Sequence, residues 1–422
     1  MTPSHQTNTI PAKDSVGYVS FLSEIFVLLS TSALIAVTFL SDRRSTVFEV
    51  ICLVALILFK VVHKRNVVAN IPPWVVVIVY LYLLSEAIGA FMSIDVNYAI
   101  RELRRFVHVF IAGLLFTVPI RDKNRKILTV VFFITAAIAG IAGILQYMDI
   151  LSTRGVYGGI EQFGRPRGFS SNAILYASIL AVACSTSIII LFTRNDDLRT
   201  SLAEQGFLLI ISLFTAGGII VSLSRGVWIS IIIACIITLL IYNSWRAVYF
   251  IVSLLLVCTI VLSLYPDFRE RAESIVTSVY SEKRMESTGY RLELWKGSFL
   301  LFKDHPIFGV GTWNFQSAID TYIQKGILKP IPDKMHAHNI YLHALATRGI
   351  IGFLLTISLL IVSFLWGKME VRCYGGIGGY IIILITVLAC IGGLTEINLD
   401  INQILATQCL AIGLMGPFRA TA

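Results

Sequence analysis

The chain has 422 residues, of which 56% are hydrophobic and only 14% are charged, and its mean hydropathy is +0.80. A soluble protein of this length carries nearly twice that share of charged residues, so the composition excludes a set of soluble domains. The net charge of +9 would suggest nucleic acid as a partner of a soluble protein. In a chain this apolar we expect membrane lipid and phosphate groups as partners, and no nucleic acid.

The apolar residues form runs that match membrane-spanning helices, which need about 20 residues each. The first 15 residues are polar and lack the basic-then-apolar order of a cleavable signal, so insertion is expected to start at the first span. The sequence therefore predicts an all-α, polytopic membrane protein. We predict twelve spans, at about residues 17–40, 46–62, 73–92, 103–120, 126–147, 172–193, 206–223, 226–242, 247–264, 345–366, 375–395 and 401–418.

Twelve spans put both termini on one side of the membrane, and the distribution of basic residues predicts that this side is the cytoplasm. The inner loops and tails then hold fourteen lysines and arginines, against nine in the short outer loops. Six of the inner residues are lysines, whereas all nine outer ones are arginines. Guanidinium groups bind phosphate through paired hydrogen bonds, so the outer arginines predict sites for a phosphorylated ligand. The alternative is that arginines at helix ends reach lipid headgroups.

One long hydrophilic segment, residues 265–344, divides the chain into spans one to nine (1–264) and spans ten to twelve (345–422). On the predicted topology this segment is an outer loop. It is rich in aromatic residues, which is not typical of a disordered tether. We expect an amphipathic helix at 290–303, begun by Ser287 or Thr288 and ended by His305-Pro306, and a second short helix with a turn at 322–331.

Three histidines, His336, His338 and His343, lie within eight residues at the end of this loop. His336 and His338 are two residues apart, which does not suit a helical metal pair, and no carboxylate cluster accompanies them in the sequence. We therefore expect no metal and no other cofactor. A histidine titrates near neutral pH, so His338 is predicted to be an acid/base group.

Three segments place arginines at the outer boundary. Arg225 interrupts an otherwise apolar hairpin, where a charge is costly unless it is paired or faces an aqueous cavity. We expect a functional role for Arg225; the alternative is a structural ion pair with Glu396 or Asp400. The three segments are GRPRGFSSN at 164–172, SLSRGVW at 222–228 and STGYRLELW, with Arg291, at 287–295.

Together these features resemble the O-antigen ligase family, which belongs to a superfamily with O-antigen polymerases and protein O-oligosaccharyltransferases. The resemblance covers most of the chain in layout, but its close motif matches are confined to 222–228 and 288–352. The motifs are Ser224-Arg225-Gly226 between adjacent spans, Tyr290-Arg291, GVGTWNF at 309–315, His338-Asn339-x-Tyr341-Leu342 and Arg348-Gly349-Ile350-Ile351-Gly352.

The resemblance implies a glycosyltransferase with a GT-C-like fold and one large helical periplasmic loop, in the inner membrane of a Gram-negative bacterium. Such ligases take a polysaccharide from undecaprenyl diphosphate at the periplasmic face and transfer it to the lipid A–core, without metal or ATP. The match carries the essential histidine onto His338 and the functional arginines onto Arg225 and Arg291. Arg165 and Arg167 fit the family's preceding loop more loosely and are expected to bind substrate.

The expected reaction inverts the anomeric carbon, with His338 as the base and the arginines holding the diphosphate. Asn339, Tyr341, Tyr290 and His336 are further candidates for binding substrate or for orienting the imidazole. A polymerase and a protein O-oligosaccharyltransferase share this donor and differ in the acceptor, so both remain alternatives.

A transporter is the alternative from another class, favoured by the twelve spans and by Glu24 and Glu86 within them. Glu86 could serve a proton relay or pair with an arginine. The lack of an internal repeat and the gathering of polar residues at one face argue against a transporter.

Overall fold

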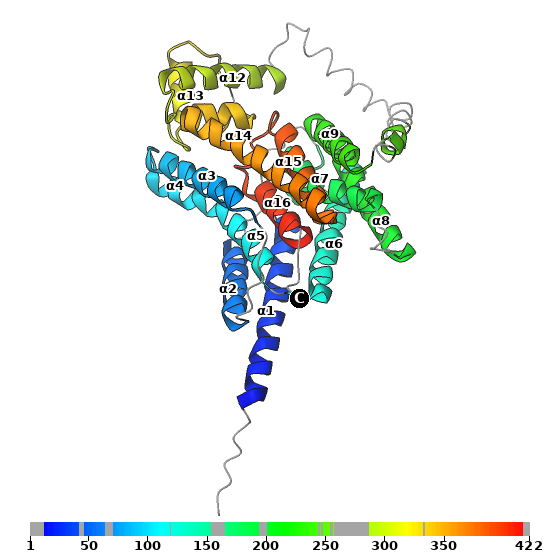
Figure 1. Ribbon diagram of the computed structural model, residues 1–422. Helices are drawn as coiled ribbons and strands as arrows, with labels where there is room; N and C mark the ends of the chain where they lie inside the picture. The colour runs from blue at the N-terminus through cyan, green and yellow to red at the C-terminus, as the bar shows by residue number, and fades with distance from the viewer. Residues whose placement is uncertain are drawn as a thin grey trace, which may run out of the picture.

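The computed structural model describes residues 12–41, 46–63, 71–118, 120–152, 165–193, 201–243, 245, 248–253, 256, 287–331 and 334–416. These ranges contain fourteen bounded α-helices and one 3₁₀ turn, and residues 248–253 are also helical, so the predicted all-α class is confirmed (Figure 1). The helices before the large loop are α1 (Ala12–Leu40), α2 (Thr46–Val62), α3 (Pro73–Phe91), α4 (Val96–Leu103), η1 (Arg104–Phe106), α5 (Val107–Thr117), α6 (Asp122–Tyr147), α7 (Ala173–Phe192), α8 (Leu202–Val221) and α9 (Arg225–Tyr242). The later helices are α12 (Ser287–Asp304), α13 (Phe315–Gln324), α14 (Ile340–Tyr374), α15 (Ile377–Gly392) and α16 (Asn402–Met415).

Seven of the described helices are long and apolar enough to cross a membrane, which confirms a polytopic membrane protein. These are α1, α3, α6, α7, α8, α9 and α14, and each coincides with a predicted span. The helices α15 and α16 are apolar but shorter, and α2 has 17 residues. The ninth predicted span, 247–264, lies mostly outside the described residues.

The fourth predicted span, 103–120, is not one continuous helix. It consists of the 3₁₀ turn η1 followed by α5, which has only 11 residues. The cause is the polar pair Arg104-Arg105 inside the predicted span. The backbone turns there, and Arg105 reaches buried carboxylates on two other segments.

The centre of the bundle is α7, which packs against α6, α8, α9, α15 and α16 and has most of its residues buried. Small residues let its neighbours approach closely, as is typical of helix packing in membranes. Tyr176 of α7 donates a hydrogen bond to the carbonyl of Ala139 at 3.1 Å and fits against Gly143 and Gly218. A methyl group at either glycine would clash with the Tyr176 ring or hydroxyl.

The large loop contains both of the helices that were predicted, but the second lies earlier in the chain than expected. The helix α12 matches the prediction of 290–303 and ends before His305-Pro306, as expected. A second short helix with a turn was predicted at 322–331; the helix α13 instead starts at Phe315 and ends at Gln324, and the turn follows at Gly326, which has φ +70°. Phe315 and Ile319 of α13 are buried in a small apolar cluster with Leu294 of α12.

The helix α14 is broken at Gly349, where φ is 64° and ψ is −159°. The segment 306–311 crosses the break and satisfies backbone groups that a continuous helix would have used. The amides of Val310 and Gly311 donate to the carbonyls of Ala346 and Thr347, both at 2.9 Å. A side chain at Gly349 would meet the backbone of Ile307, so both the conformation and the close approach require glycine at this position.

Four buried charges join α3, η1, α14 and the loop between α15 and α16. Arg105 donates to Glu86 at 3.1 Å and to Asp400 at 3.0 Å, and Arg348 pairs with the other oxygen of Glu86. Each of these side chains is at most 4% exposed. Two positive and two negative charges cancel, which is the condition for keeping ions in a dry interior. We call these four residues the buried ion cluster.

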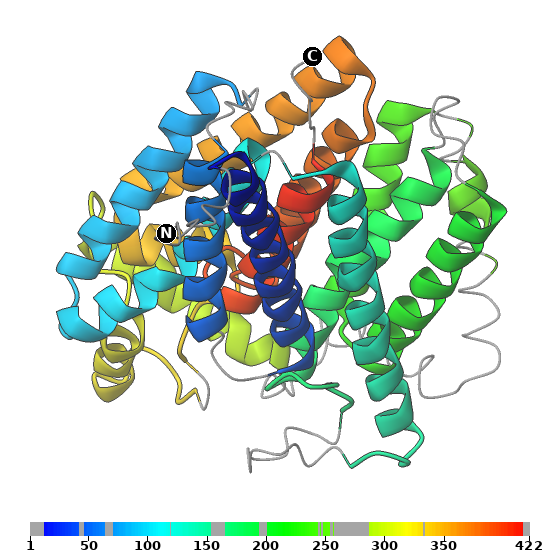
Figure 2. The ribbon, with the colours of Figure 1, turned by 90° about the horizontal axis from the view of Figure 1, so that it is seen from below.

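The two ends of the described chain lie on the side of the bundle opposite α12 and α13 (Figure 1). At that side Arg125, near the start of α6, donates to the carbonyls of Leu115 and Gly413, both at 3.2 Å, close to the ends of α5 and α16. Seen from there, α1 lies across the middle of the bundle (Figure 2).

Gly349→Ala is expected to lower the free energy of unfolding by about 3 kcal/mol, because it combines a positive φ with a clash against backbone. Gly375→Ala is the matched control: φ there is also positive, at 65°, but nothing lies within 4 Å of the added methyl. The control should cost about 1 kcal/mol, the cost of the conformation alone. Thermal unfolding of the two purified variants in one detergent measures the difference, and equal losses would contradict the proposed crossing.

Candidate active site

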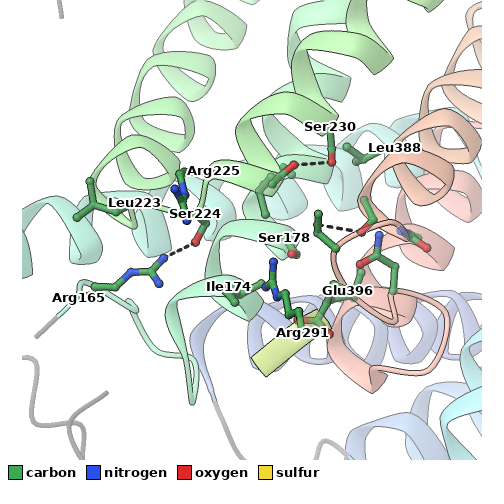
Figure 3. Close-up of a pocket in the computed structure, with 18 residues that line it drawn as sticks. Arg165, Ile174, Ser178, Leu223, Ser224, Arg225, Ser230, Arg291, Leu388 and Glu396 are labelled. Carbon is green, nitrogen blue, oxygen red and sulfur yellow. Dashed lines mark hydrogen bonds between the residues drawn. The ribbon is translucent and has the colours of Figure 1, made fainter. Parts of the chain in front are cut away.

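A cavity of about 100 Å³ lies among α7, α9, α12, α15, α16 and the loop 393–401. One water molecule needs roughly 10–15 Å³ of such space, so the cavity is large enough for a group the size of a phosphate. Arg165, Arg225 and Arg291 all line it (Figure 3). The structure thus brings together one arginine from each of the three segments that the sequence singled out.

The turn before α9 holds two of these arginines in place. Arg165 donates through Nε and a terminal nitrogen to the carbonyl of Ser222, at 2.9 and 2.6 Å, and to the Ser224 hydroxyl at 2.9 Å. Leu223 between these serines has φ +56°, which is rare for a side chain of its kind. The strained turn makes Arg225 the first residue of α9, so its positive charge adds to that of the helix N-terminus.

Close packing around Gly226 explains why the third residue of the Ser-Arg-Gly motif is glycine. A β-carbon there would lie 2.6 Å from the Thr395 hydroxyl, so glycine allows α9 to approach the loop 393–401 closely. This approach puts Arg225 and the loop residue Glu396 on the wall of the same cavity.

Arg291 of α12 lies beside Glu396 (Figure 3). Burial lowers the pKa of the Arg291 guanidinium from its usual value, and the negative charge of Glu396 opposes that shift. The helix α12 therefore contributes a positive charge that is partly removed from water. In such surroundings a guanidinium interacts more strongly with an anion than it does in bulk water.

Two histidines share the Glu396 carboxylate. Nδ1 of His338 lies 3.3 Å from one oxygen of Glu396, and Nδ1 of His336 lies 3.5 Å from the other. Burial alone would raise the pKa of Glu396, but the nearby His336 and His338 outweigh it and lower the pKa to about 2. Glu396 is therefore an anion throughout the neutral range.

The same three side chains have donor atoms within 4.8 Å of one another, a spacing that could hold a metal ion. Among the described residues this is the group with that geometry. A divalent cation there would also be close to the positive charge of Arg291, which interacts with Glu396. Repulsion between the two cations favours hydrogen bonding over metal binding at these residues.

Several predicted substrate-binding residues have roles inside the protein fold. The Asn339 side chain caps α14 by accepting from the amides of Tyr341 and Leu342, both at 3.0 Å, and also donates to the carbonyl of Leu394. The Tyr341 hydroxyl donates to the carbonyl of Cys390 at 2.8 Å. Both side chains stabilise the segment that carries His338.

Tyr290 and Arg167 do not line the cavity. Tyr290 packs against the apolar cluster of α12 and α13. Arg167 donates to the carbonyl of Ser171 at 3.1 Å at an exposed position. Arg165 is therefore the residue of the GRPRGF segment that reaches the cavity.

The sequence suggests Glu396 only as a structural partner for Arg225, whereas the structure puts it between Arg291 and His338. The sequence feature that indicates a site here is a series of polar residues, Glu396, Asn398 and Asp400, in a short loop between two apolar helices. With Glu396 included, the arrangement can bind an anionic group at the arginines and move a proton at His338.

Residues 207–357 match the family model described as O-Antigen ligase. This segment runs from α8 into α14 and includes Arg225, Arg291 and His338. An uncharacterized protein of Haemophilus influenzae is 24% identical over 153 residues, which are 34% of this chain and 38% of that relative. The chain thus spans well under half the length of this relative. Residues 207–357 form an O-antigen ligase domain, which confirms the resemblance found in the motifs.

Arg225→Ala and Arg291→Ala are each expected to weaken the binding of inorganic pyrophosphate about tenfold, because each removes a charge-assisted contact. Arg101→Ala, which removes an exposed arginine of α4 outside the cavity, is the control and should bind normally. Calorimetric titration of the purified protein at two salt concentrations measures both effects. Equal binding by all three variants would show that the cavity is not the anion site.

Proposed function

From the O-antigen ligase domain at 207–357, we propose that the protein is a glycosyltransferase that moves a polysaccharide from undecaprenyl diphosphate to the lipid A–core. The observation that carries the proposal is the cavity in which three arginines from separate segments meet next to the Glu396–His338 pair. This combination suits a reaction that releases a diphosphate and removes a proton from a hydroxyl group.

The donor half of the reaction uses the arginines. Cleavage of the bond between the anomeric carbon and the diphosphate leaves negative charge on the phosphate oxygens. Arg225 and Arg291, with Arg165 bracing the turn, stabilise this charge as it develops, in a site that is partly shielded from water. The diphosphate is itself a good leaving group, so transfer needs no further source of energy.

The acceptor half of the reaction uses His338. The acceptor hydroxyl gives its proton to the imidazole, and its oxygen bonds to the anomeric carbon. The bond to the diphosphate breaks, and the diphosphate leaves with that electron pair. Attack from the side opposite the leaving group inverts the anomeric configuration. General base catalysis of this kind contributes a factor of about 10²–10⁴ to the rate.

The helix α12, whose Arg291 lines the cavity, lies on the side of the bundle opposite the two ends of the described chain (Figure 1). With cytoplasmic termini, as the distribution of lysine and arginine predicts, this side is the periplasmic face of the bacterial inner membrane. Both substrates are lipids that reach such a site along the membrane.

Purified protein with undecaprenyl-diphosphate-linked glycan and lipid A–core, in the presence of a chelator, is expected to form the joined product. Parallel reactions with a second lipid-linked glycan or with an acceptor peptide test the polymerase and the protein glycosyltransferase. Product in either of those reactions, and none with lipid A–core, would assign the acceptor differently. Product that requires an added metal ion would contradict the mechanism.

In this assay His338→Ala is expected to lower kcat about 10²–10⁴-fold, because it removes the base. His305→Ala, at an exposed histidine of the same loop, is the matched control and should retain full activity. Arg225→Lys and Arg291→Lys keep the charge but lose the paired hydrogen bonds, so each should raise KM for the donor. Full activity of His338→Ala would rule out the proposed base.

A further inference from the structure

We propose that Glu396 is the positioning residue of the reaction: it holds the Nδ1–H of His338, so that Nε2 is free to take the proton of the acceptor hydroxyl. The inference rests on the proposed function. It assigns a task to a residue outside the matched domain, in the loop between α15 and α16.

The tautomer of His338 follows from the charge of its partner. An ionised carboxylate can only accept hydrogen bonds, so the 3.3 Å contact requires the hydrogen to be on Nδ1 of His338. The lone pair of the neutral ring is then on Nε2. The other oxygen of Glu396 accepts the amide of Ile397 at 3.0 Å, which fixes the carboxylate plane.

Hydrogen bonds between their two segments set the separation of the His338 and Glu396 side chains. The amide of Ile340, two residues after His338, donates to the carbonyl of Gly393 at 2.8 Å. The side-chain amide of Asn339 donates to the carbonyl of Leu394 at 3.3 Å. Four residues beyond Glu396, Asp400 is anchored in the buried ion cluster. The loop is thus tied to the His338 segment before Glu396 and to the bundle after it.

His338 also has a constrained backbone, with φ +48°. This conformation is unfavourable for a residue with a side chain and is found where the surroundings enforce it. The His338 amide lies 3.4 Å from Nδ1 of His336, which is also 3.5 Å from Glu396. Neutral His336 accepts from this amide, whereas protonated His336 donates to Glu396 instead. The titratable and charged groups around Glu396 are the two histidines and Arg291, and the charge of Asp400 is paired within the buried ion cluster.

The carboxylate acts when His338 takes the proton. The imidazole becomes an imidazolium with hydrogens on both nitrogens, and Glu396 stabilises the new positive charge through the Nδ1–H contact. Glu396 keeps its own charge throughout. The proton moves from the acceptor hydroxyl to Nε2, and it leaves to solvent or to the departing diphosphate after the new glycosidic bond has formed.

Glu396→Gln is expected to lower kcat about 10²-fold, because the amide can hold the wrong tautomer and gives the imidazolium no counter-charge. The acidic limb of the kcat profile should move to lower pH for the same reason. KM for the donor should stay equal or fall, because Arg291 loses a nearby negative charge. Glu396→Asp should recover part of the rate, and Glu293→Gln, at a carboxylate of α12 outside the cavity, should be normal.

A structural defect alone would produce a different result. It would raise KM for the donor and lower the unfolding temperature, and it would leave the pH profile of the residual activity unchanged. Asp400→Asn, which disturbs the same loop through the buried ion cluster, provides that comparison. If Glu396→Gln behaves like Asp400→Asn, or has the kcat and pH profile of the wild type while His338→Ala is inactive, the positioning role is wrong and the proposed function still holds.

The tautomer gives a test that does not depend on turnover. Nitrogen-15 spectra of histidine-labelled protein, with His338 assigned by comparison with His338→Ala, should show Nδ1 protonated at neutral pH and a change of tautomer in Glu396→Gln. If the wild-type protein shows this tautomer but transfers no glycan, the proposed function is rejected and the Glu396–His338 hydrogen bond still stands. Spectra that change only after zinc is added would overturn the inference in favour of a metal site.

Discussion

The position of the loop 393–401, which carries Glu396, depends on the buried ion cluster of Glu86, Arg105, Arg348 and Asp400. Ions in a dry interior are stable only when every charge has a partner, so the segments that carry these residues must meet in one arrangement. Aromatic rings cover the charges: the Arg348 guanidinium lies 5.0 Å from the centre of the Tyr82 ring, and that of Arg105 lies 5.5 Å from Trp313. Asp400 carries this constraint to Glu396 along a loop of a few residues. Because the four ions can be buried only in this paired arrangement, the neighbouring site has a fixed geometry.

The candidate site combines opposite demands on the same few residues. Its arginines must present positive charge to a phosphate, and they must also lie close enough to a carboxylate to remain charged when they are buried. Arg291 meets both conditions because burial lowers its pKa and Glu396 counteracts the shift. The same carboxylate contacts two imidazoles, so one negative charge lies beside both the proposed anion-binding arginine and the proposed base. Because the single carboxylate of Glu396 serves both groups, the cavity stays positively charged overall.

The sequence predicted those features that come from local pattern. Apolar runs gave most of the membrane-spanning helices, and the outward-facing arginines together with the histidine motif indicated which residues to expect at the site. Other features depend on contacts distant in sequence. The turn at Arg105 is explained only by Glu86 and Asp400, which are 19 and 295 residues away. The motif makes Asn339 and Tyr341 candidates for holding a sugar or orienting the imidazole, and the sequence does not reveal that their polar groups cap a helix and bind a backbone carbonyl. The role of Glu396 required knowing that α15 and α16 bring their connecting loop to His338.

The buried ion cluster also bears on how the chain is made. Its members enter the membrane in chain order: Glu86, Arg105, Arg348 and finally Asp400. After Arg348 is synthesised and before Asp400 follows, two arginines of the cluster face one carboxylate, and the partly built cluster carries one uncompensated positive charge. An unpaired buried ion costs several kcal/mol, so a chain that stops before Asp400 cannot settle into the mature packing. Synthesis of the loop 393–401 therefore also neutralises the buried charge of the bundle. A chain truncated before this loop is expected to be unstable and to be degraded by quality-control proteases.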